Sequence, residues 1–263
     1  MPFNSSGEIR YFQFQLFGSS LPHALVTRHG GVSPAPWAGL NMGGTVGDDP
    51  HRVGENRRRA LAALGRDPDS VFDVWQVHGV DVAIAAAPRP PEAPHLQADA
   101  ILTRNPGLTL MMRFADCVPI LLHDPVGGVV GLAHAGWMGT VRGTAAAAVR
   151  AMQTSFGSAA KNIRAGIGPS IGPDHYEIGE DVAAQVRQAF GSEAARLLAA
   201  GDGESVYLDL WAANVLHLQQ AGVEQIEVAG LCTACHLEDW FSHRAEHGRT
   251  GRFGALIALG EAG

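Results

Sequence analysis

The sequence predicts an α+β fold in a single domain that spans residues 1–263. Strand-like apolar runs follow one another directly between residues 71 and 133, whereas helical patterns gather mainly in the second half of the chain. A parallel sheet built from βαβ units would instead alternate strand and helix regularly. The 263 residues are 46% hydrophobic, which is enough for a large core, and no stretch has the composition of a domain linker.

Short apolar runs bounded by turn residues predict the strands. They cover residues 24–27, 71–77, 80–86, 100–102, 118–122, 128–133, 163–167, 226–229 and 253–259. His78-Gly79 is expected to form the turn between the second and third of these strands. Helical periodicity and capping residues predict helices at residues 50–64, 138–156, 180–190 and 210–221.

Charge and hydropathy exclude several classes of partner. The net charge is −7 and there is no long basic run, whereas nucleic acid and anionic membranes require a clustered positive field. No segment is apolar for long enough to cross a bilayer, and the N-terminus lacks the pattern of a secretory signal. We therefore expect a cytoplasmic protein with reduced cysteines, either a monomer or a small homo-oligomer.

Three loop segments each carry one ligand suited to zinc. They are Gln76-Val77-His78-Gly79, Ala115-Asp116-Cys117-Val118 and Ala133-His134-Ala135-Gly136. Two imidazoles and one thiolate form a three-ligand set, and a catalytic zinc site keeps its fourth position open for water or substrate. Asp116, next to Cys117, is a candidate to orient a ligand or to act as a base. Each of these residues alone has an ordinary structural interpretation.

Other chemistries compete for the same residues. Cys117 with His134 or His78 would also form a metal-free nucleophile and base pair. A multicopper oxidase needs His-x-His pairs, and the 12 histidines include none, so copper is disfavoured. Cys232, Cys235 and His236 match the haem attachment pattern, but only one copy exists and no export signal precedes it. The same Cys-x-x-C resembles half of a zinc site, and no second Cys-x-x-C completes it.

Ten motifs in order resemble the YfiH-type laccase-domain family, whose members have been called polyphenol oxidase, purine nucleoside phosphorylase and peptidoglycan editing factor. The resemblance covers about residues 27–259. The motifs are TRHGGVS, LNMGGTVGDDP, ENRRRAL, WQVHG, ADAILT, ADCVPILLHDP, AHAGWMGTVRG, AGIGPSIGPDHYEIG, LDLWAANVLHLQQAGV and FSHRAEHGRTGRF.

The resemblance implies mixed sheets between helical layers and one zinc ion held by His78, Cys117 and His134. It also implies phosphorolysis of adenosine, inosine and methylthioadenosine, with deamination of adenosine. Arg28, Asn41 and Arg57 are candidates for contacts to the nucleoside or phosphate, because they are polar residues inside matched motifs. A loop hydrogen bond for Asn41 and a surface salt bridge for either arginine are the alternative interpretations.

The chain departs from the family pattern at several positions. Met138 stands where relatives often have arginine, and Asp174-His175 stands where they often have two cysteines. These changes leave the zinc set intact but affect the expected phosphate contacts. Two alternative functions remain open at this point: a hydrolase that edits a peptidoglycan precursor with the same site, and a metal-binding protein without turnover.

Overall fold

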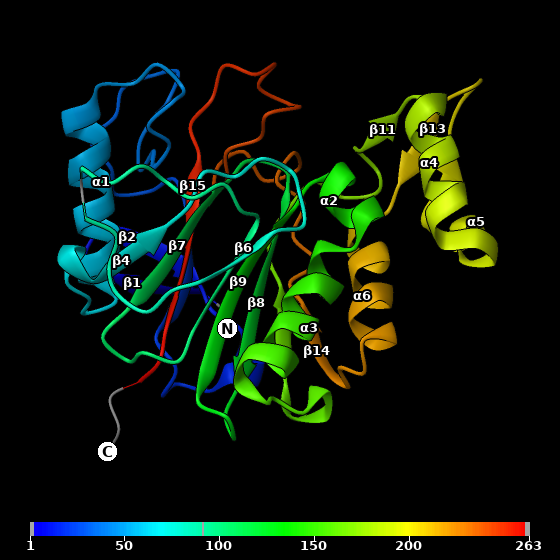
Figure 1. Cartoon of the computed structure of the whole chain (residues 1–263). Coiled ribbons are helices and arrows are strands. Elements are labelled where there is room, and N and C mark those ends of the chain that lie inside the picture. Colours follow the sequence, from blue (N-terminus) through cyan, green and yellow to red (C-terminus); the bar gives the residue numbers. More distant parts are fainter. Residues whose placement is uncertain (1–2, 91, 261–263) are drawn as a thin grey trace.

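Two six-stranded sheets face one another, and helices cover their outer faces (Figure 1). The computed structural model describes residues 3–90 and 92–260. Its architecture is α+β with mixed sheets, as the sequence predicts. Within the described ranges, no helix has both the length and the apolar character needed to cross a membrane.

The first sheet is antiparallel except at one edge, where β4 runs parallel to β7. Its strands, in spatial order, are β1 (Phe3–Ser6), β2 (Ile9–Phe12), β3 (His23–Val26), β15 (Phe253–Ala258), β7 (Thr109–Phe114) and β4 (Val71–Asp73).

The second sheet has parallel pairs at both edges and antiparallel pairs in its centre. Its strands, in spatial order, are β14 (Gln225–Val228), β10 (Arg164–Ile167), β8 (Val118–Asp124), β9 (Val129–Ala135), β6 (Ala100–Thr103) and β5 (Val82–Ile84). A small third sheet contains β11 (Glu177–Ile178), β13 (Val206–Leu208) and β12 (Leu198–Ala200).

Helix α1 packs on the first sheet, and α3 and α6 pack on the second, while α4 and α5 stand beside the third sheet (Figure 1). The α-helices are α1 (Pro50–Ala63), α2 (Trp137–Arg142), α3 (Thr144–Phe156), α4 (Glu180–Phe190), α5 (Ala194–Leu197) and α6 (Leu210–Gln220). Short 3-10 turns lie at η1 (Gln15–Phe17), η2 (Pro68–Ser70), η3 (Ala160–Asn162) and η4 (Gly191–Glu193).

Strand β8 shows how the layers share one core. Ile120 and Leu122 face the helices, whereas Leu121 faces the first sheet, because side chains alternate across a strand. All three are fully buried. A strand buried on both faces appears in sequence as an unbroken apolar run, and this explains the run of residues 118–122.

Most expected elements are confirmed, including the helices at 180–190 and 210–221 and the strands at 163–167 and 253–259. Two expectations are wrong. Residues 138–156 do not form one helix, because Gly143 adopts a left-handed conformation (φ 80°) between α2 and α3. The strands on either side of His78 do not pair; β4 joins the first sheet and β5 the second. Strands β1, β2 and β7 and the third sheet were not predicted.

We predict that Leu121→Ala lowers the free energy of unfolding by about 2–5 kcal/mol, because it leaves a cavity between the two sheets. Val126→Ala is the matched control. Val126 is 76% exposed in the β8–β9 turn, so this change should stay within about 0.5 kcal/mol. Urea unfolding measures both. Equal effects would show that the space between the sheets is not the principal core.

Candidate metal centre

The structure gathers His78, Cys117 and His134 at one end of the layer between the two sheets. Their ligand atoms all lie within 4.8 Å of one another, and Cys117 Sγ lies 4.0 Å from His78 Nε2. The topology explains the meeting. The chain segments that carry His78 and Cys117 both cross from the first sheet to the second, and His134 lies near the end of β9.

Asp99 holds two of these segments together. Its carboxylate is fully buried and accepts a hydrogen bond from His134 Nδ1 at 2.8 Å. It also accepts the backbone N–H groups of Val77, His78 and Gly79 at 3.1, 3.0 and 2.7 Å. Because Nδ1 of His134 is engaged, Nε2 is the nitrogen left to face Cys117. In metal sites, a ligating histidine usually donates its other ring N–H to a carboxylate, and this hydrogen bond orients the imidazole.

The turns that carry the ligands have unusual backbone conformations. His78 and Asp116 have positive φ values of 60° and 80°, which are uncommon for residues other than glycine. Gly136 packs against the ligands, since a Cβ there would lie 2.9 Å from Cys117 Sγ and 3.1 Å from His78 Cδ2. A side chain at residue 136 would therefore displace the two ligands.

The local charges favour a thiolate at Cys117. Burial by itself raises the pKa of this thiol, but the neighbouring His134 and His78 outweigh it and lower the pKa to about 6. Burial likewise opposes the charged form of His134, yet Cys117 and Asp99 raise its pKa to about 9. A thiolate and two imidazole nitrogens that can release their protons fit a borderline-soft divalent metal ion, and binding would displace a proton from His134.

Asp116 is next to Cys117 in the chain, and both of its carboxylate oxygens are engaged by the C-terminal segment. Its carboxylate accepts hydrogen bonds from Thr233 Oγ1 at 2.7 Å and from the backbone N–H of Arg244 at 2.6 Å. These contacts fix the Cys117 turn to the C-terminal segment. The role of ligand orientation that the sequence suggested for Asp116 is filled in the structure by Asp99.

The three ligands open into a cavity of about 560 Å³. Arg57, Arg113 and Arg252 also line it, and none of the described residues that line it is acidic. Arg57 donates two hydrogen bonds to the carbonyl oxygen of Met42, and Arg252 donates to the carbonyl oxygens of Thr250 and Gly251. Both guanidinium groups are thus held by neutral acceptors.

The three arginines make this part of the cavity lining positively charged. Asp73 behind the cavity forms ion pairs with Arg89 and Arg113, so one carboxylate serves at least two guanidinium groups. Burial and the nearby charge of Arg113 lower the pKa of Arg57 to about 10. Burial and the like charge of Arg113 both make the charged form of Arg57 more costly, and an anion bound in the cavity would offset that cost.

The other two predicted substrate residues lie outside this lining. Asn41 is fully buried, and its Oδ1 accepts the N–H groups of Gly43 and Arg252, both at 2.9 Å. It therefore shapes the cavity wall from behind. Arg28 forms an ion pair with Glu246 at 3.3 Å and lies over the ring of Phe241, away from the cavity.

Sequence reasoning missed several residues of the site, each of which carried a weak signal. Asp99 belongs to the Ala-Asp pair that echoes Ala115-Asp116 before the next apolar strand. Arg113 is separated from the ADC motif by Phe114 alone, and Arg252 closes the GRTGR motif. Nothing in the sequence showed that these three segments meet.

A model of the family described as multi-copper polyphenol oxidoreductase laccase matches residues 22–260. The chain belongs to this laccase-domain family. It is 43% identical over 247 residues to "Purine nucleoside phosphorylase" from Deinococcus radiodurans, covering 91% of this chain and 90% of the relative. It is 39% identical over 245 residues to "Purine nucleoside phosphorylase YlmD" from Geobacillus stearothermophilus, covering 90% and 89%.

Solved structures of laccase-domain proteins share the whole architecture. YlmD from Geobacillus stearothermophilus superposes with a TM-score of 0.91 at 36% identity, covering 99% of both chains. Bacillus licheniformis YfiH, described as a hypothetical protein, gives 0.89 at 31% identity, covering 98% and 99%. The family's descriptive name mentions copper, whereas the relatives' names describe nucleoside phosphorolysis.

We predict that Asp99→Asn weakens binding of zinc at His78, Cys117 and His134 by about 10–100-fold, because the carboxylate orients His134 and its turn. Competition against a chromophoric chelator measures the affinity. Asp202→Asn, in an exposed loop remote from the cavity, should leave it unchanged. An unchanged affinity in folded Asp99→Asn protein would contradict the orienting role.

Proposed function

We propose that this protein is a zinc-dependent purine nucleoside phosphorylase of the cytoplasm that also deaminates adenosine. One observation carries the proposal: a two-histidine, one-cysteine cluster opens into a cavity lined by three arginines, in a chain 36–48% identical to proteins named purine nucleoside phosphorylase. Phosphorolysis needs a site for the nucleoside and an adjacent site for an anion, and the cavity offers surfaces for both.

Arg57, Arg113 and Arg252 are the proposed phosphate ligands. A guanidinium group can donate two parallel hydrogen bonds to two oxygens of one phosphate. Where its protein partners are neutral carbonyl groups, its positive charge is not neutralised and can attract an anionic substrate. Gly43-Gly44 lies between two of them: a Cβ on Gly43 would meet Arg252 Cγ at 2.7 Å, and one on Gly44 would lie 3.6 Å from Arg57 Nη2. These arginines would supply the anion contact that Met138 cannot provide where relatives often have arginine.

Trp75 is the proposed platform for the purine. Its side chain lines the cavity and is 49% exposed, which is high for tryptophan. A planar base can stack on an exposed indole face, and such contacts are worth about 0.5–1.5 kcal/mol beyond the area they bury. The platform and the arginines would hold base and phosphate on opposite sides of the ribose.

In the proposed reaction a phosphate oxygen forms a bond to the anomeric carbon, while the bond from that carbon to the purine nitrogen breaks. The bonding pair leaves with the purine, which takes up the proton that the attacking hydrogen phosphate gives up. The arginines hold the phosphate in line, a positioning effect that removes much of the entropic barrier. A zinc ion at His78, Cys117 and His134 would supply a Lewis acid with an open coordination position.

For deamination, Asp116 is the proposed proton carrier, because it is buried and adjacent to Cys117. Its hydrogen bonds to Thr233 and Arg244 would have to be exchanged for contacts to substrate or water. The same Cys117 and His134 pair would also serve a metal-free nucleophile mechanism, so metal dependence is the feature that separates the two mechanisms.

The test is product analysis by mass spectrometry with adenosine, with and without phosphate. The proposal expects adenine and ribose-1-phosphate only when phosphate is present, and inosine in either case. Cys117→Ala, His78→Ala and His134→Ala should each lose the zinc ion of this site and turnover together. Unchanged adenosine in all conditions would contradict the proposal, and full turnover by metal-free protein would support the Cys117 nucleophile instead.

We predict that Arg57→Ala raises the KM for phosphate by about 10-fold or more, since a hydrogen bond to a charged group contributes about 1.5–3 kcal/mol. Arg58→Ala is the matched control on the same helix, because Arg58 is exposed and pairs with Glu55 at 2.7 Å. Steady-state kinetics at saturating adenosine measures both. Equal effects of the two changes would place the phosphate elsewhere.

A further inference from the structure

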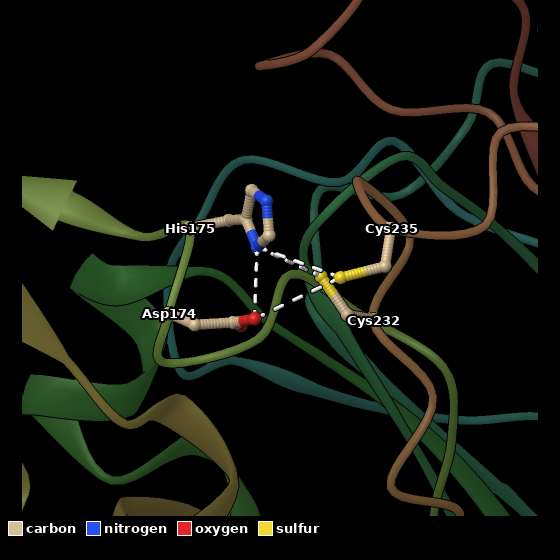
Figure 2. Close-up of side chains that lie close together, drawn as sticks. All are labelled: Asp174, His175, Cys232 and Cys235. Atoms are coloured by element: carbon tan, nitrogen blue, oxygen red, sulfur yellow. Dashed lines mark hydrogen bonds and ion pairs between the residues drawn. The ribbon is translucent and has the colours of Figure 1, made fainter.

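A second group of metal-binding side chains lies outside the cavity lining described above. Figure 2 shows Asp174, His175, Cys232 and Cys235 turned toward one another from two loops that are far apart in sequence. Their ligand atoms all lie within 4.8 Å of one another. The Cys-x-x-C that looked like half of a zinc site is therefore completed by an aspartate and a histidine from the loop before β11, and not by a second Cys-x-x-C.

Four of the distances within this cluster lie within about 0.1 Å of the edge lengths of a metal-centred tetrahedron. His175 Nδ1 lies 3.5 Å from Cys235 Sγ and 3.9 Å from Cys232 Sγ. Asp174 Oδ2 lies 3.2 Å from His175 Nδ1 and 3.8 Å from Cys235 Sγ. Tetrahedral zinc with bonds of about 2.3 Å to sulfur and about 2.0–2.2 Å to nitrogen and oxygen has ligand–ligand edges of roughly 3.3–3.8 Å.

The backbone around the cluster is organised to hold it. Cys232 pairs with Ser170 in an isolated parallel bridge, and its Sγ accepts the N–H of Gly172 at 3.1 Å. Gly172 has no room for a side chain, because a Cβ there would lie 2.7 Å from Asp174 Oδ1 and 3.2 Å from Cys232 Sγ.

We propose that Asp174, His175, Cys232 and Cys235 bind a second divalent metal ion of the zinc class. Four protein ligands close the coordination shell, so this site is structural, whereas the three-ligand site in the cavity keeps an open position. Two thiolates next to a carboxylate would repel one another, and a divalent cation between them removes that repulsion. The proposal is independent of the reaction that the cavity catalyses.

The second metal would stabilise the support of the first site. Thr233, between the two cysteines, donates the hydrogen bond to Asp116 that fixes the Cys117 turn. On the other loop, Tyr176 follows His175, and its ring lies under the guanidinium of Arg244. The backbone N–H of Arg244 donates the second hydrogen bond to Asp116. A metal that joins the two loops therefore clamps both of the contacts that position Asp116.

Cobalt(II) titration of reduced, chelator-stripped protein tests the proposal. Wild-type protein should bind about two equivalents, and the double variant His78→Ala/Cys117→Ala about one. The remaining equivalent should show a thiolate-to-cobalt charge-transfer band, which only cysteine ligands produce. In that background, Cys235→Ser and His175→Ala should each bind at least tenfold more weakly. At saturating cobalt the band should fall to about half in Cys235→Ser, which keeps one thiolate, and should persist in His175→Ala, which keeps both.

His236→Ala is the matched control. His236 is adjacent to Cys235, but its ring contacts Glu238 at 3.1 Å and is not part of the cluster. It should bind cobalt with unchanged affinity and the same band. Failure of the double variant to bind any cobalt, with Cys232 and Cys235 present as free thiols, would overturn the proposal, as would a Cys232–Cys235 disulfide that persists under reducing conditions. Because Cys235 is exposed, Cys235→Ser is expected to fold.

Discussion

The buried carboxylate of Asp99 is the interaction on which the site depends. It lies just before β6 in the second sheet and accepts four hydrogen bonds, three from the turn that carries His78 and one from His134. Burial alone would raise the pKa of Asp99, but these donors lower it, so the group stays charged inside the protein. A buried charge of this kind is tolerated only when it is fully satisfied. Loss of these hydrogen bonds would leave the buried charge of Asp99 unsatisfied. The turn that carries His78 and the strand that carries His134 are therefore held in fixed positions relative to one another.

Local signals in the sequence were sufficient for most of the secondary structure. Helices such as α4 and strands such as β10 follow from periodicity and capping within a few residues of their observed bounds. The wrong predictions lie where contacts between distant segments determine the local structure. Gly143 could have continued a helix, but it adopts φ 80° at the turn to α3, where a Cβ would lie 3.5 Å from the ring of His217. Strands β4 and β5 look like a hairpin from their spacing alone, yet each finds its partner across a longer distance in the chain.

In the candidate site, too, some residues could be identified from local sequence and others only from the tertiary structure. Ligand chemistry singled out His78, Cys117 and His134, because few side chains suit a borderline-soft metal. The residues that orient and charge the site were harder to find. Asp99, Arg113 and Arg252 are ordinary in sequence and become significant only through their position around one cavity. Asn41 and Arg28 stand in matched motifs, yet their hydrogen bonds serve the loops behind the cavity. Asp174 and His175 stood out in the sequence only as a departure from the family pattern, and the structure places them beside Cys232 and Cys235.

The proposed function depends on a metal ion held by His78, Cys117 and His134 in a cavity whose arginines bind phosphate. Anomalous X-ray diffraction across the zinc absorption edge, from crystals of the native protein soaked in phosphate, tests this most directly. We expect a zinc peak within coordination distance of Cys117 Sγ and both imidazoles, with phosphate density against Arg57, Arg113 or Arg252. A site without anomalous signal in active protein, or a phosphate bound away from these arginines, would contradict it.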